Sequence, residues 1–339
     1  MRVGTPTTIS NRSCEDFAYK ADDTWAKLPL GWTWLEATSV AVNSQDRVYV
    51  FNRSDHPVMV FGSDGSFLHA WGEGLFRRPH GIFIGPDDAV YCIDDLGHTV
   101  RKFSPTGELL LTLGVDGQAS NSGAMSIDYR TIVRSAPPFH FPTNVALSPQ
   151  GEIYVSDGYG NARVHKFTAD GQLLLSWGDP GGGPGRFHVP HGIAVDDQGQ
   201  VFVADRENSR IQIFSANGEY VTEWNDVARP CQVFINRAGD IYVAELGFLS
   251  GMWPGTIAPA GATGGRLSIF YPNGELKARW GGGRNPCAPG DFYAPHDLWV
   301  DSLGDIYVAE VTMSAGGNRG LVSSECHSLQ KFVNLSRTL

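Results

Sequence analysis

Hydrophobic and polar residues alternate in short stretches along most of the chain, and one such stretch recurs six times. Its copies read DRVYVFN, DAVYCID, GEIYVSD, GQVFVAD, GDIYVAE and GDIYVAE, at residues 46–52, 88–94, 151–157, 199–205, 239–245 and 304–310. Alternation with a period of two predicts a β-strand, and the β-branched and aromatic residues in these copies favour the same structure. Each copy follows an apolar strand such as GIAVDD and a turn that contains Gly or Asp. The pattern therefore predicts a repeated antiparallel unit.

Most copies continue into a second hairpin. An amphipathic strand ends in Phe, an Asn-Gly or Asp-Gly type turn follows, and a closing strand ends on Trp-Gly or similar, as in FTADGQLLLSWG. These dipeptides supply the positive φ that a two-residue hairpin needs. Six units of four short antiparallel strands predict an all-β, six-bladed β-propeller. The blades are expected at about 31–74, 75–114, 138–178, 183–225, 226–282 and 284–335.

The last copy ends at QKFVNL, without a closing strand. Residues 1–30 form an N-terminal extension, and the stretch around 14–30 is expected to supply the missing outer strand and to close the ring. Long insertions rich in Gly, Ser and Ala interrupt the pattern at 115–137, 247–265 and 312–326. Loops of this length inside a compact repeat are usually functional or disordered. We expect these insertions to lie on a rim of the disk.

Composition excludes several classes of protein. A net charge of −10 argues against nucleic acid or an anionic membrane as a partner. No run of 18 or more apolar residues predicts a membrane span, and the first residues lack the apolar region of a signal peptide. The five cysteines are scattered and form no CxxC motif. These features predict a cytoplasmic protein with reduced cysteines, either a monomer or a weak oligomer.

The most specific feature is a Pro-His pair at the entrance of three of the six innermost strands. It occurs in RRPHGIFI, HVPHGIAV and YAPHDLWV, with the histidines His80, His191 and His296 in blades 2, 4 and 6. Alternate blades of a six-bladed ring place them about 120° apart on one axis. Three imidazoles with an open position are typical of catalytic zinc. The equivalent channel-lining positions of the other blades are Thr38, Thr143 and Cys231, and Cys231 is a lining residue or a fourth ligand.

Two further irregularities point to chemistry. The segment DGYGNAR of blade 3 is one residue longer than DRENSR of blade 4, and the extra length presents Tyr159 at the strand end. Near a cation this phenol could act as a base; the alternative is an aromatic cap on the sheet edge. In FNRSDH of blade 1, Arg53 lies on the same rim and could bind a carboxylate. The alternative is a salt bridge to Asp55 or to a neighbouring blade.

The segment VFVADRENSRIQIF resembles the NHL repeat, in which Asp205 and Arg210 are expected to form a structural ion pair. The chain from about 37 to 335 also resembles the peptidyl-α-hydroxyglycine α-amidating lyase family. That resemblance implies zinc on His80, His191 and His296, Tyr159 as the base and Arg53 as the substrate-binding arginine. It also implies a structural calcium in the channel. The implied calcium ligands are Asp297 and the backbone carbonyls of Val40 and Ile82.

The sequence departs from the family pattern at two places in the site. Ala294 stands where the family has Met, two residues before the third histidine, and Gly160 replaces a disulfide cysteine after the tyrosine. The implied metal and catalytic set is intact, but these departures put a peptide substrate in doubt.

We therefore expect a zinc-dependent lyase that cleaves an N-acyl α-hydroxyglycine, or a similar carbinolamide, to an amide and an aldehyde such as glyoxylate. Its substrate would be a small or peptide-like molecule. One alternative is a metal-dependent hydrolase or lactonase on the same propeller, with Glu245 or Glu310 as acid/base. The other is a non-catalytic NHL scaffold that binds a protein, although such a scaffold would not need the three histidines.

Overall fold

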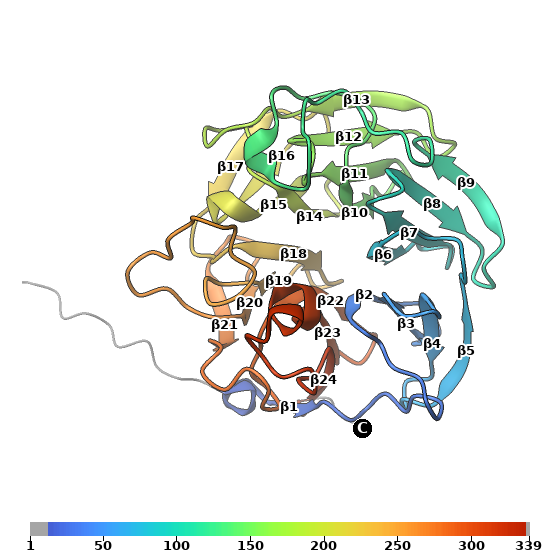
Figure 1. Cartoon of the computed structure of the whole chain (residues 1–339), viewed down its shortest axis with the longest axis vertical. Helices are drawn as coiled ribbons and strands as arrows, with labels where there is room; N and C mark the ends of the chain where they lie inside the picture. Colours follow the sequence, from blue (N-terminus) through green and yellow to red (C-terminus); the bar gives the residue numbers. More distant parts are fainter. Residues whose placement is uncertain (1–12, 337–339) are drawn as a thin grey trace, which may run out of the picture.

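A computed structural model describes residues 13–336 of the chain. Six four-stranded antiparallel sheets surround a central channel (Figure 1). The predicted all-β six-bladed propeller is therefore confirmed. Residues 1–12 of the expected N-terminal extension lie outside the described residues. The structural ion pair of the NHL-like segment is also present, with Arg210 Nε 2.8 Å from Asp205 Oδ2.

Each of the first five blades consists of four consecutive strands, with the innermost first. Blade 1 comprises β2 (Ala37–Val42), β3 (Val48–Asn52), β4 (Val58–Phe61) and β5 (Phe67–Trp71). Blade 2 comprises β6 (Pro79–Ile84), β7 (Val90–Asp94), β8 (Thr99–Phe103) and β9 (Leu109–Leu113). Blade 3 comprises β10 (Pro142–Leu147), β11 (Ile153–Asp157), β12 (Arg163–Phe167) and β13 (Leu173–Trp177). Blade 4 comprises β14 (Pro190–Val195), β15 (Val201–Asp205), β16 (Arg210–Phe214) and β17 (Tyr220–Trp224). Blade 5 comprises β18 (Pro230–Ile235), β19 (Ile241–Glu245), β20 (Arg266–Phe270) and β21 (Leu276–Gly281).

The two ends of the chain build the sixth blade together. Its inner strands are β22 (Pro295–Val300), β23 (Ile306–Glu310) and β24 (Leu329–Asn334). The outer strand is β1 (Tyr19–Asp22), which pairs antiparallel with β24 and brings Tyr19 opposite Asn334. The Tyr19 ring also stacks on Trp280 of blade 5, with the ring centroids 5.5 Å apart. The stretch from which we expected a clasp thus supplies the strand that closes the ring.

The core lies between neighbouring blades. Apolar side chains of adjacent sheets interdigitate, as Ile93 of blade 2 does with Val145 and Val155 of blade 3. At the channel, the pairing of every innermost strand with its neighbour shifts register immediately after the strand's first residue. Such a bulge turns the side chain of the extra residue away from the normal alternation. The bulge falls on the six equivalent positions that the sequence predicts to line the channel.

One structural prediction from the cysteines is wrong. Cys287 and Cys326 form a disulfide, with Cα atoms 4.8 Å apart. It links the loop before β22 to the insertion at 312–326, which also contains the short helix α1 (Thr312–Ala315). Cys14, Cys92 and Cys231 are free and buried. In the described part of the chain, no helix is long and apolar enough to cross a membrane.

Candidate metal and catalytic site

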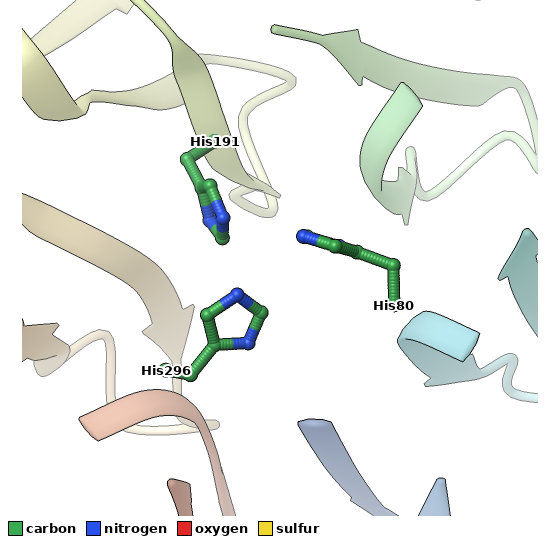
Figure 2. A group of neighbouring side chains, drawn as sticks. All are labelled: His80, His191 and His296. Carbon is green, nitrogen blue, oxygen red and sulfur yellow. The ribbon is translucent and has the colours of Figure 1, made fainter. Parts of the chain in front are cut away.

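Three imidazoles meet in the channel. His80, His191 and His296 come from β6, β14 and β22, and their rings point toward one another (Figure 2). One ring nitrogen of each lies within 4.8 Å of those of the other two, and all three side chains are buried. Among the described residues, only these three form such a group of potential metal ligands, so Cys231 is not a fourth member. The three predicted ligand residues therefore converge as expected.

Backbone carbonyls of the intervening blades orient these rings. Each Nδ1 lies within hydrogen-bond distance of the carbonyl at the equivalent position of the next blade. The bonds run from His80 to Thr143 (2.7 Å), from His191 to Cys231 (2.8 Å) and from His296 to Thr38 (2.7 Å). A carbonyl only accepts, so each Nδ1 carries the proton and each Nε2 presents its lone pair to the channel. Metal-binding histidines are commonly held in this way.

In blades 2 and 4, the residue after the histidine must leave room for that carbonyl. A Cβ at Gly81 would lie 2.8 Å from the Thr143 oxygen, and one at Gly192 would lie 2.6 Å from the Cys231 oxygen. This explains the Pro-His-Gly sequence of blades 2 and 4. Blade 6 has Asp297 at the same position.

The electrostatic environment keeps the imidazoles neutral. Burial is the main cause: it lowers the pKa of His296 to about 3 and the pKa values of His80 and His191 well below the usual range. Nearby positive charges, including Arg53 and Arg206, lower them further. The neutral imidazole is the form that binds a metal. Three neutral nitrogens and no thiolate are a donor set that fits zinc or a similar transition metal.

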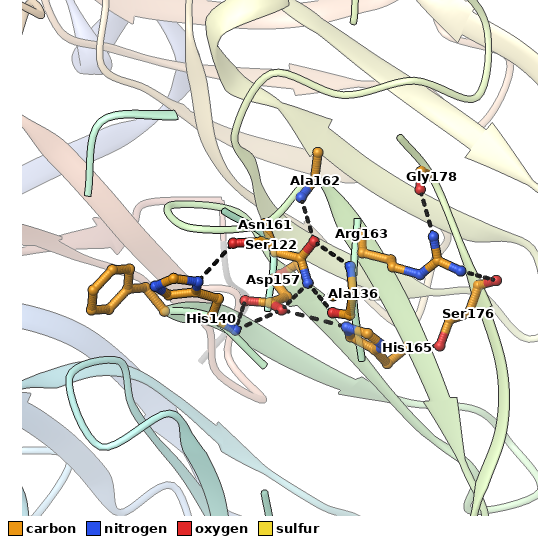
Figure 3. Close-up of polar contacts among 12 residues, drawn as sticks. Ser122, Ala136, His140, Asp157, Asn161, Ala162, Arg163, His165, Ser176 and Gly178 are labelled. Carbon is orange, nitrogen blue, oxygen red and sulfur yellow. Dashed lines mark hydrogen bonds and ion pairs between the residues drawn. The ribbon is translucent and has the colours of Figure 1, made fainter. Parts of the chain in front are cut away.

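Tyr159 is held over this site by the longer strand connection of blade 3. Asp157 accepts hydrogen bonds from the His140 backbone N–H (2.9 Å) and from Asn161 Nδ2 (2.8 Å), which fixes both ends of the connection (Figure 3). A Cβ at Gly158 would collide with the Pro190 carbonyl. The glycines beside Tyr159 are thus needed for close packing, since neither has a positive φ.

The Tyr159 hydroxyl contacts the histidine nitrogens directly. It lies 3.0 Å from His191 Nε2 and 3.3 Å from His80 Nε2, and it accepts a hydrogen bond of 3.1 Å from Arg206 Nη1. The Arg206 guanidinium also lies over the Tyr159 ring, 5.2 Å from its centroid. Burial raises the pKa of Tyr159, and the Arg206 charge opposes that rise. Tyr159 is therefore part of the channel site and does not cap a sheet edge.

Arg206 is the residue that sequence reasoning missed. It directly follows the structural Asp205, and its side chain crosses from blade 4 to the tyrosine of blade 3. Glu207 accepts a bond from Arg206 Nε (2.8 Å) and one from Arg229 Nη2 (2.9 Å). The sequence offers one signal for Arg206: it directly follows Asp205, which aligns with Asp157, so it lies on the rim that carries Tyr159.

Arg53 lies at the channel mouth beside the histidines. Its Nη1 forms an ion pair with the buried carboxylate of Glu36, and its Nε donates to the Pro79 carbonyl at 3.2 Å. The alternative of a salt bridge to Asp55 or a neighbouring blade is wrong, because the ion pair of Arg53 is with Glu36, which precedes the inner strand of the same blade. The Arg53 side chain remains 21% exposed and so is accessible to a ligand.

Asp297 and the Ile82 carbonyl, both implied as calcium ligands, are linked through Ser39. Asp297 is buried and accepts hydrogen bonds from Gln232 Nε2 (2.6 Å) and from the Ser39 hydroxyl. The same hydroxyl lies 3.5 Å from the Ile82 carbonyl, and Val40 follows Ser39. Burial raises the pKa of Asp297 to about 7, against the hydrogen bonds from Ser39 and Gln232. The donors here are mainly oxygen atoms, which calcium prefers.

Glu245 and Glu310, the candidate acids of the hydrolase alternative, have structural partners instead. Glu310 accepts from the backbone N–H groups of Tyr293 (2.9 Å) and Ala294 (3.1 Å). Glu245 is paired with Arg266 at 2.8 Å. Both are fully buried and stand at the strand end that Asp157 and Asp205 occupy in other blades.

All three insertions contact residues around the site. Asn161 bonds to Ala136 of the first insertion, and Arg229 donates to the carbonyl of Ser250 in the second at 3.1 Å. Ser314 of the third lies 3.4 Å from Arg53 Nη1. The first two also touch each other, through a 2.9 Å bond from Arg130 to the Pro254 carbonyl. The insertions therefore surround the mouth of the channel.

Comparison with known proteins agrees with this architecture. A family model for the NHL repeat matches residues 139–167 and 187–214. Human NHL repeat-containing protein 3 is 32% identical over 315 residues, which cover 88% of this chain and 82% of that protein. The chain belongs to the NHL-repeat family of β-propellers. Peptidyl-α-hydroxyglycine α-amidating lyase 1 of Drosophila melanogaster is 33% identical to this NHL-repeat propeller over 175 residues, 48% of the chain and 30% of that lyase. The resemblance to the NHL repeat is thus confirmed, and the relatives of this chain include amidating lyases.

A solved structure supports the fold alone. Virginiamycin B lyase from Staphylococcus aureus superimposes with a TM-score of 0.57 at 13% identity, over 93% of this NHL-repeat propeller and 99% of that enzyme.

Proposed function

We propose that this propeller is a metal-dependent lyase that cleaves the C–N bond of an N-acyl α-hydroxyglycine, or a similar carbinolamide, to an amide and an aldehyde such as glyoxylate. The observation that carries the proposal is the position of the Tyr159 hydroxyl, within 3.3 Å of two histidine nitrogens and bonded to Arg206. The sequence similarity to amidating lyases supports the same chemistry.

Two metal ions belong to the proposal. His80, His191 and His296 would hold zinc, which when bound supplies a Lewis acid that favours ionisation of the substrate's α-hydroxyl. Asp297, with the carbonyls of Val40 and Ile82, would hold a structural calcium. The neutral nitrogens of the first set and the oxygen-rich second set match the ligand preferences of these ions.

In this proposal, the protein residues have separate roles. Arg53 binds the substrate carboxylate, for which its guanidinium is held in place by Glu36. The Tyr159 phenolate, stabilised by Arg206, takes the proton of the α-hydroxyl. The electron pair on that oxygen forms the carbonyl of the aldehyde as the C–N bond breaks. The departing amide nitrogen takes a proton back from Tyr159, so the step consumes no water.

Both alternatives are less well supported by the geometry. A hydrolase needs an acid/base carboxylate beside the reacting centre, and Glu245 and Glu310 are bonded to groups of their own blades instead. A binding scaffold gives no reason for three neutral imidazoles and a tyrosine hydroxyl to meet in the channel.

Glyoxylate release from α-hydroxyhippurate by the metal-loaded protein tests the lyase directly. Tyr159→Phe should lower kcat by roughly 10²–10⁴-fold, the usual effect of a general base, with unchanged metal content. Tyr220→Phe, on an exposed outer strand, is the matched control. In ¹⁸O-water a lyase leaves the new amide unlabelled. Labelled carboxylic acid together with full activity of Tyr159→Phe would establish a hydrolase.

The disulfide bears on the compartment. Structural disulfides persist in oxidising environments and are rare in the cytoplasm. We therefore propose an oxidising compartment in place of the cytoplasmic one expected from the sequence. Mass spectrometry of the alkylated native protein should find Cys287 and Cys326 unmodified and linked.

A further inference from the structure

A second guanidinium is fixed at the channel mouth, two residues before the first histidine. Arg78 donates from Nε to Asp95 Oδ1 (2.7 Å) and from Nη2 to Asp95 Oδ2 (2.6 Å). Asp95 is fully buried, whereas the Arg78 side chain is 24% exposed. This two-point contact uses one edge of the guanidinium. Within residues 13–336, the structure shows no hydrogen bond to its remaining nitrogen, Nη1.

Arg78 faces the same site as Arg53. Arg53 Nε donates to the carbonyl of Pro79, the residue between Arg78 and His80, so the Arg53 side chain lies against the backbone segment that carries Arg78. The Arg78 charge contributes to the low pKa of His80, after burial and the other imidazoles. Tyr159 in turn helps Asp95 to hold the pKa of Arg78 above its usual value in spite of burial. Arg78 therefore belongs to the mouth of the channel.

Stability alone gives little reason for this pair. Burying an ion pair contributes little net stabilisation, because both charges lose their hydration. The same construction recurs around the mouth, where Glu36 holds Arg53 and Glu207 holds Arg206. Each buried acid holds a guanidinium in a single orientation, which lowers the entropy lost when that arginine binds an anion. The mouth thus carries oriented guanidinium groups, each paired with a buried acid, on a chain whose net charge is −10.

We propose that Arg78 binds a second carboxylate of the substrate, so that the preferred substrate is an N-acyl α-hydroxyglycine whose acyl part carries its own carboxylate. Arg53 takes the glycine carboxylate and Arg78 takes the other. This inference rests on the proposed lyase function for the identity of the substrate. It makes Arg78 a specificity-determining residue rather than a catalytic one.

A matched pair of substrates tests it. N-succinyl-α-hydroxyglycine carries the second carboxylate, and N-succinamoyl-α-hydroxyglycine has nearly the same shape without that charge. The wild type should prefer the succinyl compound in kcat/KM by at least about tenfold at 0.15 M salt, which screens surface charge. Arg78→Gln should reduce the preference to about one. The adjacent Arg77→Gln is the control, because Arg77 is 57% exposed and pairs with Asp116, and it should keep the preference.

Calorimetry separates this inference from the lyase proposal. Glutarate should bind more tightly than butyrate to the wild type and to Arg77→Gln, but not to Arg78→Gln. If no substrate releases glyoxylate while glutarate binding still depends on Arg78, the lyase proposal fails and the second anion site stands. If glyoxylate is released equally from both substrates, the lyase stands and this inference is wrong. If Arg78→Gln does not fold, two other measurements test the inference. The wild type must prefer the succinyl compound, and Arg78→Lys, which keeps the charge but loses the two-point contact with Asp95, should reduce that preference.

Discussion

The hydrogen bond from Arg206 to Tyr159 leads to a prediction of definite size. Arg206→Gln removes a charged donor 3.1 Å from the phenol oxygen in a site where the arginine is only 5% exposed. A hydrogen bond to a charged group contributes about 1.5–3 kcal/mol, and about 1.4 kcal/mol corresponds to a tenfold change in rate. The substitution should therefore lower kcat by roughly 10–150-fold. It should also raise the pKa of Tyr159 further and move the onset of activity to higher pH.

A double-mutant cycle isolates this contact from the other roles of Arg206. In a Tyr159→Phe background the phenolate is gone, so adding Arg206→Gln should cost less than about threefold. Glyoxylate release supplies the rates, and melting temperature and metal content show that each variant is intact. Arg229→Gln is the control, since Arg229 shares Glu207 but does not contact Tyr159. Equal losses from Arg206→Gln in both backgrounds would refute the reasoning.

Three more predictions concern metal and pH. His191→Ala should lose most of about one bound transition metal per chain in elemental analysis, because one of three ligands is gone; full occupancy would contradict the three-histidine site. Asp297→Asn should abolish the rise in melting temperature that added calcium gives the wild type, since only the native state holds that ion. Burial lowers the pKa of His327, but Glu310 outweighs this, so the pKa is raised. The stabilisation that protonated His327 gives the fold is therefore complete below pH 6.5 and is lost as pH rises through the pKa of His327 in the folded protein. Urea unfolding should show that loss of stability in the wild type and not in His327→Gln.

Sequence alone could predict the architecture and the centre of the site. Six copies of one strand pattern specify the blades, and the constant register across copies places His80, His191 and His296 on one ring. Tyr159 could be found because its strand connection breaks the repeat. Repetition therefore converts positions far apart in the chain into neighbours in space.

Other features are only partly marked by the repeat, or not at all. The register places Arg206 on the rim that carries Tyr159, but its contact with the tyrosine of the adjacent blade leaves no periodic signal. Cys287 and Cys326 lie outside the repeated strands, so nothing in the pattern brings them together. Glu245 could have been assigned correctly, because it aligns with Asp205, whose role in the blade was predicted from the NHL pattern.

The carbonyl bonds that orient the histidines also cross the seam where the ring closes. His296 of blade 6 bonds to Thr38 of blade 1, and Asp297 bonds to Ser39 across the same junction. An ion held by His80, His191 and His296 would link points separated by about a hundred residues each along the chain, which removes configurational entropy from any opened ring. Metal uptake would thus act as an internal cross-link. Chelation should let blade 6 detach more readily, and hydrogen exchange in β1 and β24 should accelerate before that of the other blades.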